Sequence, residues 1–149
     1  MQLSKNLSLS EMIRSESAKR LGINNMPTQE HLDNMKKLAI NIFQPIREHF
    51  NIPIHISSGY RSLALNKAIK GASTSQHCKG EAMDIDMDAT NITNKQIFNY
   101  IKDNLVFDQL IWEGSGKDNP DWVHVSYSTS GKQRKQILKT NDKKTYTNY

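Results

Sequence analysis

The chain has 149 residues and a single cysteine, Cys78, so it cannot form an intrachain disulfide bond. Small secreted domains that are held together by several such bonds are therefore excluded. At this length a chain usually folds as one domain around its own hydrophobic core. We expect a single folded unit stabilised by core packing, with any bound metal adding to its stability, and we interpret Cys78 as a small packed residue.

Long apolar runs are also absent. No segment approaches the roughly twenty consecutive apolar residues that a membrane-spanning helix requires. The segment from Met1 to Ser8 contains no apolar run of the kind found in a secretory signal peptide. We therefore expect synthesis in the cytoplasm without a signal peptide, and no insertion into a membrane.

Aromatic residues make up only 7% of the chain, although its net charge is +5. The basic C-terminal part does not alternate regularly with aromatic residues, as surfaces that stack nucleic-acid bases do, and it contains no recognisable nucleic-acid-binding motif. A solvent-exposed basic end is the simpler interpretation, and a nucleic-acid-binding protein is the weaker one. We place a domain at residues 1–130 and a basic tail at 131–149. The basic residues of this tail are Lys132, Arg134, Lys135, Lys139, Lys143 and Lys144.

Signals for helices and for strands are mixed along the chain. Two segments, which begin at Ser8 and Thr93, have the form of capping boxes that open helices. A longer helix is predicted to begin at Thr28, because apolar residues recur at helical spacing up to Ile46, and Pro45 is expected to kink or shorten its last turn. These signals predict a single α+β domain with a small, mainly antiparallel sheet flanked by helices. Strands are expected at about 54–57, at 82–87, from about 110, and at 122–127.

Histidine and aspartate residues occur in a pattern typical of a metal site. Residues 82–87 alternate between acidic or small and apolar side chains, so an extended strand would turn Asp84 toward a cleft and the apolar side chains toward a core. His77 could return to Asp84 through a turn around Gly80. His124 lies in a second alternating segment, and a neighbouring strand could bring it to the same ion.

Three protein ligands leave the fourth position of a tetrahedral zinc site open for water, which distinguishes a catalytic zinc site from a closed structural one. The pattern therefore indicates a metallohydrolase. Such an enzyme needs a general base, and Asp121, three positions before His124, is the candidate. Glu113 is the alternative, either as the base or as a carboxylate that orients a ligand imidazole.

The same residues belong to a set of ordered motifs. Residues 75–86 read S-x-H-x-x-G-x-A-x-D-x-D, a later D-x-x-H ends at His124, and residues 58–62 read S-G-Y-R-S. In this order they resemble the zinc D-Ala-D-Ala carboxypeptidase family. That family includes the D,D-dipeptidases of vancomycin resistance and the L-alanyl-D-glutamate endopeptidases of phage endolysins, and it shares a fold with the Hedgehog signalling domain. The resemblance runs from about Leu9 to Ser126.

The resemblance implies a role for each motif residue. His77, Asp84 and His124 match the ligands of one catalytic zinc ion. Asp121 matches the catalytic base, at a position where many relatives have Glu and the endolysin-like branch has Asp. Arg61 matches the arginine that contacts substrate and stabilises the oxyanion of the tetrahedral intermediate, a role that suits a guanidinium group because it is always charged.

The resemblance also implies a substrate. It indicates a zinc-dependent peptidase that hydrolyses an amide bond in the peptidoglycan stem peptide, as a D-Ala-D-Ala carboxypeptidase or as an endolysin-type endopeptidase of a bacteriophage. Ser75 matches a position that hydrogen-bonds substrate in some relatives. We expect a monomer that acts on the cell wall after release or delivery. The alternative is a non-catalytic Hedgehog-like or virion-associated domain that binds the cell wall.

Overall fold

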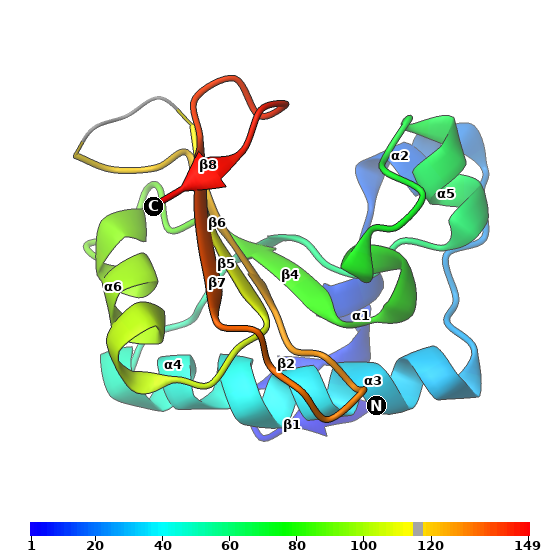
Figure 1. The fold of residues 1–149 in the computed structure, drawn as a ribbon. Coiled ribbons are helices and arrows are strands. Elements are labelled where there is room, and N and C mark those ends of the chain that lie inside the picture. Colours follow the sequence, from blue (N-terminus) through cyan, green and yellow to red (C-terminus); the bar gives the residue numbers. More distant parts are fainter. Residues whose placement is uncertain (115–117) are drawn as a thin grey trace.

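The fold contains two β-sheets within the residues that the structure describes. The structure is a computed structural model, and it describes residues 1–114 and 118–149. The smaller sheet pairs the first two strands. The larger sheet has the strand order β3-β4-β6-β5-β7-β8 and runs through the middle of the molecule (Figure 1). The strands are β1 (Gln2–Ser4), β2 (Leu7–Ser8), β3 (Ile56–Ser58), β4 (Ala82–Ile85), β5 (Gln109–Glu113), β6 (Trp122–Ser126), β7 (Gln136–Thr140) and β8 (Thr147–Asn148).

Helices surround the larger sheet. In Figure 1, α3 and α4 run along the bottom of the sheet, α6 lies beside it, and α2 and α5 project together on the far side of the site described below. In the part of the chain that the structure describes, no helix is long and apolar enough to cross a membrane. The helices are α1 (Leu9–Ile13), α2 (Glu16–Leu21), α3 (Gln29–Leu38), the π-helix η1 (Ala39–Phe43), α4 (Gln44–Phe50), α5 (Leu63–Ala68), the 3-10 helix η2 (Gln76–Lys79) and α6 (Asn94–Asn104).

The larger sheet has an apolar and a polar face because side chains alternate along each strand. Ile85, Val123 and Val125 of the central strands are fully buried and belong to the same core as Leu38 and Phe98 of the helices. Burying a side chain of this size contributes about 1.5–3 kcal/mol to folding. The opposite face is left for polar side chains, and the candidate site lies on it.

A π-helical turn interrupts the long helix that begins after Thr28. α3 continues into η1 and η1 into α4, which carries Pro45 in its first turn. Proline has no backbone N–H and its ring crowds the preceding turn, so a regular α-helix cannot pass through it unchanged. The wider turn accommodates Pro45 while Phe43 and Ile46 stay buried. The disturbance expected from the sequence therefore lies before the proline, and the helix continues beyond it.

The α+β class and the mainly antiparallel sheet are confirmed. Both capping boxes are formed, at Ser8 with Glu11 and at Thr93 with Gln96. Among the strands that the structure describes, β5 and β7 are the parallel pair of the larger sheet, and its other neighbours are antiparallel.

Residues beyond 130 take part in the larger sheet. We expected a basic tail at 131–149, whereas β7 pairs with β5 and β8 pairs with β7 at the edge of the sheet. The apolar signal of β7 is limited to Ile137 and Leu138, which stand among basic and polar residues, and the partner strand is distant in the sequence. Local pattern therefore could not show that these residues continue the sheet.

Asp108 fixes the start of β7 to the rest of the fold. This residue is 3% exposed, and its carboxylate accepts hydrogen bonds from the backbone N–H and Nε of Arg134, both at 3.0 Å, and from Nη2 of Arg134 at 2.8 Å. Nε2 of Gln76 donates another at 3.1 Å. The hydrogen bonds from Arg134 outweigh the effect of burial and hold the pKa of Asp108 below its ordinary value.

Replacing Asp108 by Ala is expected to lower the free energy of unfolding by about 2 kcal/mol, because several donors lose their acceptor. Because the pKa of Asp108 is depressed, its contribution is present above the ordinary pKa of Asp and is lost as the pH falls toward the lowered one. The matched control is Asp103→Ala, since the Asp103 side chain is 61% exposed and pairs with Lys102 at the surface. Urea unfolding at pH 7 measures both variants, and equal losses would contradict an anchoring role for Asp108.

Candidate active site

Asp84 and His124 face each other across two neighbouring strands. β4 and β6 pair in a register that sets Asp84 opposite His124, and Nδ1 of His124 lies 2.9 Å from Oδ1 of Asp84. On the other face the same register buries Met83 against Val125. A slip of one residue would turn these apolar side chains toward solvent, so the core holds the polar pair in place.

His77 approaches Asp84 from a short helix. Ser75 opens η2 by accepting the backbone N–H of His77 at 3.2 Å, and Gly80 closes it in the left-handed region, with φ of 75°. Nδ1 of His77 lies 2.7 Å from the carbonyl oxygen of Gly59. Because a carbonyl oxygen only accepts, Nδ1 carries the hydrogen. In the neutral ring Nε2 then presents its lone pair to Oδ1 of Asp84, 3.3 Å away.

Position 59 requires glycine because the backbone of α1 lies too close for a side chain. A Cβ atom at this position would collide with the backbone carbonyl oxygen of Met12. The backbone of residues 58–60 therefore packs directly on α1, and this contact sets the position of the carbonyl group that orients His77.

His77, Asp84 and His124 fit a zinc ion. One candidate ligand atom from each residue lies within 4.8 Å of the other two. Tetrahedral ligands that are about 2.0–2.2 Å from zinc are about 3.3–3.6 Å apart, and the separations here are 3.3 Å and 2.9 Å. A lone pair of His77 that faces a carboxylate oxygen is repulsive, and a cation between them would relieve this repulsion.

The negative charge of Asp84 also favours a bound cation. Burial alone would raise its pKa, but when the imidazole rings are protonated the positive charge of His77 and hydrogen bonds from both rings outweigh burial and hold the pKa of Asp84 well below its ordinary value. Asp84 is therefore an anion at neutral pH. The positive charge that it requires can come from protonated imidazole rings or from a metal ion.

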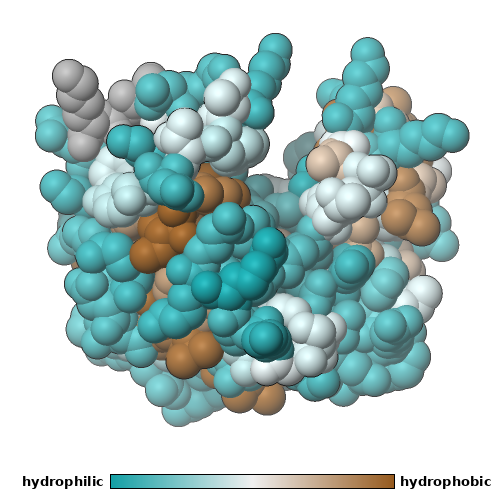
Figure 2. Space-filling model, viewed as in Figure 1, coloured by the Kyte–Doolittle hydropathy of each residue, from teal (hydrophilic) through white to brown (hydrophobic). Residues whose placement is uncertain are grey.

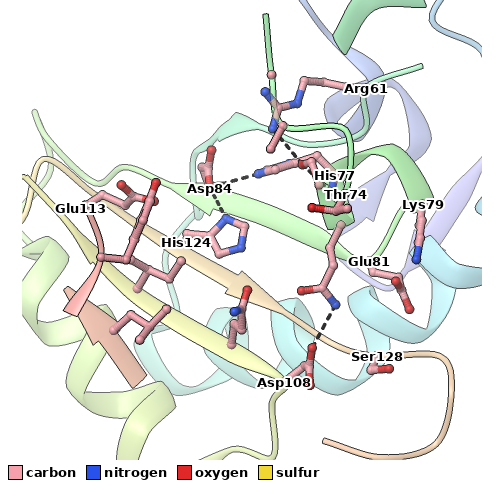
Figure 3. Close-up of a pocket in the computed structure, with 18 of the residues that line it drawn as sticks. Arg61, Thr74, His77, Lys79, Glu81, Asp84, Asp108, Glu113, His124 and Ser128 are labelled. Carbon is pink, nitrogen blue, oxygen red and sulfur yellow. Dashed lines mark hydrogen bonds and ion pairs between the residues drawn. The ribbon is translucent and has the colours of Figure 1, made fainter. Parts of the chain in front are cut away.

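The three residues line a cleft of about 1270 Å³. Arg61 and the loop of residues 70–75 form one wall, and β5, β7 and the loop between β7 and β8 contribute to the other. Figure 2 shows the surface hollowed between two projecting parts, and Figure 3 shows His77, Asp84 and His124 together on the cleft side of the sheet. A cleft of this size admits a peptide.

Glu113 lines the same cleft. It pairs with Trp122 across β5 and β6, and Trp122 shares one face of β6 with His124 because the two are two residues apart on the strand. Glu113 is only 6% exposed. Burial and the nearby charge of Asp84 raise its pKa to about 7, against the opposing effects of His124 and Lys143. A carboxyl group with a pKa near neutrality can both accept and return a proton, as a general base and acid must.

Asp121 lies at the rim and is not among the described residues that line the cleft. Its side chain is 53% exposed, and its Oδ2 pairs with Nζ of Lys143 at 2.8 Å. The backbone N–H of Asp121 donates to the carbonyl oxygen of Glu113 at 2.8 Å, at a bend just before β6 begins at Trp122. Of the two candidate bases only Glu113 lines the cleft among the described residues, and the catalytic role of either carboxylate stays a prediction.

Arg61 and Ser75 lie together beside His77. Nη2 of Arg61 donates to Oγ of Ser75 at 3.3 Å, and the backbone N–H of Arg61 donates to the carbonyl oxygen of His77 at 3.2 Å. Among the described residues, Nε of Arg61 is buried without a hydrogen-bond partner. Buried donors of this kind favour an acceptor, so this wall suits a substrate oxygen. The substrate-binding roles of both residues stay predictions.

A comparison with protein families gives the decisive observation: a sequence model of the Peptidase M15 family matches residues 5–126. The chain belongs to the M15 peptidase family. The resemblance to zinc D-Ala-D-Ala carboxypeptidases is thereby confirmed, and the α+β fold is consistent with that of an M15 peptidase. M15 peptidases are zinc-dependent, and the His77, Asp84 and His124 cluster could hold the metal. No curated protein matches the chain.

Part of the cleft lies outside the range matched to the M15 family. Lys143, Lys144 and Tyr146 line it from the loop between β7 and β8. We assigned the two lysines to a solvent-exposed tail and did not single out Tyr146. The sequence signal that could have placed them is the apolar pair of β7, Ile137 and Leu138, which is too short to predict a strand by itself.

Replacing Glu113 by Gln is expected to stabilise the chelator-treated protein at pH 8 by about 2–3 kcal/mol. The raised pKa means that folded Glu113 binds its proton up to about pH 7, whereas the unfolded chain releases it near 4.5. The destabilising effect of Glu113 therefore grows as the pH rises from 4.5 to about 7, and it is absent below pH 4.5. Urea unfolding of both proteins at pH 4.5 and pH 8 measures the difference, and an equal difference at both pH values would contradict the raised pKa.

Proposed function

We propose that this M15 peptidase uses zinc to hydrolyse an amide bond in the peptidoglycan stem peptide. The observation that carries the proposal is the convergence of His77, Asp84 and His124 in a peptide-sized cleft. The family supports the peptidase activity, and it suggests a substrate related to peptidoglycan.

In this proposal His77 binds zinc through Nε2, Asp84 through Oδ1 and His124 through Nδ1, the atoms that face one another. Zinc held by three protein ligands supplies Lewis-acid chemistry, polarising a carbonyl group and lowering the pKa of water toward about 7. The hydrogen bond from His77 to Gly59 fixes the ring in the orientation that this role requires.

Glu113 moves the proton in the proposed reaction. Its carboxylate accepts a proton from the attacking water as the oxygen bonds to the scissile carbonyl carbon, and it returns that proton to the departing nitrogen as the C–N bond breaks. Arg61 donates hydrogen bonds to the carbonyl oxygen, where negative charge develops. Ser75 holds Nη2 of Arg61 at this wall through the 3.3 Å hydrogen bond.

The proposal is tested by digesting purified peptidoglycan with the zinc-loaded protein and identifying the released fragments by mass spectrometry. Loss of a terminal D-Ala indicates a D-Ala-D-Ala carboxypeptidase, and cleavage after L-Ala indicates an endolysin-type endopeptidase. Peptidoglycan that binds the protein but stays intact would instead support the non-catalytic cell-wall-binding domain. If the protein neither binds nor cleaves peptidoglycan, the proposed substrate is contradicted.

A further inference from the structure

The loop between β7 and β8, residues 141–146, begins at the catalytic end of the cleft. β7 pairs in parallel with β5 so that Thr140 lies opposite Glu113, and the carbonyl oxygen of Thr140 accepts the N–H of Gly114 at 2.9 Å. The loop therefore leaves the sheet next to Glu113. Figure 1 shows it rising above β8 and leaning toward α2 and α5.

The backbone of this loop is braced from within. Oδ1 of Asp142 accepts the N–H groups of Lys144 and Thr145 at 2.8 Å and 2.7 Å. Oγ1 of Thr140 accepts the N–H of Lys143 at 2.8 Å and donates to Asp142 at 3.2 Å. These bonds set the position of the backbone, so the side chains of the loop extend into the cleft from a fixed base.

The two lysines of the loop differ in their partners. Nζ of Lys143 pairs with Asp121 at 2.8 Å and lies 4.5 Å from the centre of the Trp122 ring, so its charge is already satisfied. Lys144 also lines the cleft, and within the described residues it has no ion pair. It is the cation of this loop that can take an anionic ligand.

The cleft as a whole favours an anion. Its described lining contains seven basic and four acidic residues. Two of the acidic residues are engaged, Asp84 with the imidazole rings and Asp108 with Arg134. Arg61 supplies positive charge on the opposite wall from Lys144. A ligand that spans the cleft therefore meets a cation on each side of His77, Asp84 and His124.

Tyr146 adds a hydroxyl group to the same wall. Burial and the charges of Glu113, Asp84 and Asp142 raise the pKa of Tyr146, so its hydroxyl stays protonated. The hydroxyl donates a long hydrogen bond, 3.4 Å, to the carbonyl oxygen of Lys143, which a shorter bond to a ligand oxygen could replace. An ammonium group and a phenol hydroxyl on one wall suit a carboxylate, which accepts several hydrogen bonds through its two oxygens.

We propose that Lys144 and Tyr146 form a carboxylate-binding subsite, and that the substrate is an acidic peptide whose free carboxylate lies on the opposite side of the scissile bond from Arg61. This inference rests on the proposed peptidase function and adds a substrate requirement to it. The subsite is built by residues outside the range matched to the family.

The test measures peptide binding to zinc-loaded Glu113→Gln protein by calorimetry, so that turnover does not consume the ligand. The probes are the pentapeptide L-Ala-γ-D-Glu-L-Lys-D-Ala-D-Ala and two analogues, one amidated at the D-Glu α-carboxylate and one at the C-terminus. Binding of each peptide is measured to the Glu113→Gln protein itself and to the same protein with Lys144→Glu or Lys139→Glu added. Lys139 is the matched control, because it lies on β7, is exposed and does not line the cleft.

We expect Lys144→Glu to weaken binding of the acidic peptide about tenfold or more, a loss that corresponds to one charge-assisted hydrogen bond. One of the two amidated peptides is expected to bind the Glu113→Gln protein as weakly as the acidic peptide binds the Lys144→Glu variant, and Lys144→Glu should not weaken it further. The carboxylate that is amidated in this peptide is then the one that binds the subsite. Lys139→Glu is expected to have no effect.

Equal effects of the two lysine substitutions, or equal sensitivity of all three peptides to Lys144→Glu, would overturn the subsite while leaving the peptidase function standing. If no peptide binds and the wild-type protein also releases no product, the proposed function itself fails and the subsite fails with it.

Discussion

Zinc-loaded Glu113→Gln protein is expected to hydrolyse stem peptide about 10²–10⁴-fold more slowly than the wild type, while still binding zinc. Glutamine keeps the size of the side chain but cannot accept the proton of the attacking water. Glu113 lines the cleft, and in the metal-free protein burial raises its pKa to about 7, so it is placed to exchange a proton there. Initial rates of peptide hydrolysis and metal analysis of the same preparations measure the two quantities.

The matched control is Asp121→Asn, the same change of carboxylate to amide at the residue that the motif indicated. Asp121 pairs with Lys143 at the rim, and its side chain is 53% exposed. We expect its rate to stay within about twofold of the wild type, as for a surface substitution. The opposite result, a large loss with Asp121→Asn and none with Glu113→Gln, would return the base to Asp121.

Asp84→Ala protein is expected to lose zinc binding and activity together. If three ligands share the roughly 10 kcal/mol or more that a protein zinc site supplies, removing one weakens zinc binding by about 3–4 kcal/mol, or roughly 10²–10³-fold. Asp84 contacts both imidazole rings, so its loss also removes the group that orients them. Zinc affinity measured with a competing chelator tests this expectation.

His55→Ala is a suitable control for loss of a potential metal ligand. His55 is exposed and does not belong to the cluster of His77, Asp84 and His124. We expect this variant to bind zinc like the wild type. If His55→Ala weakens zinc binding as much as Asp84→Ala does, the metal does not occupy the cluster.

Strand alternation predicted much of this site. Asp84 and His124 each stand in a segment where polar and apolar residues alternate, and burial of Met83 and Val125 in the core sets the two polar residues opposite each other. The turn around Gly80 is formed as expected. The sequence did not predict the 3-10 helix, capped by Ser75 and Gly80, that holds the His77 ring against Gly59.

The motif alone did not separate the two carboxylates, because their surroundings come from distant parts of the chain. Asp121 lies at a bend before β6 and pairs with Lys143, which comes from a loop far along the chain. Glu113 reaches the cleft through its pairing with Trp122 in the neighbouring strand. Both relations depend on tertiary contacts. The β7 pairing that brings Lys143 into place is equally absent from local sequence pattern.

Titration of chelator-treated protein with zinc, followed by stem-peptide hydrolysis, tests the central claim most directly. The claim predicts no hydrolysis without zinc, a rate that rises in proportion to added zinc, and a plateau at one ion per chain. Asp84→Ala protein, titrated in parallel, should stay inactive at the same zinc concentrations. Full hydrolysis by the metal-free protein, or a rate that does not depend on zinc, would contradict the assignment of His77, Asp84 and His124 as the site of a catalytic metal.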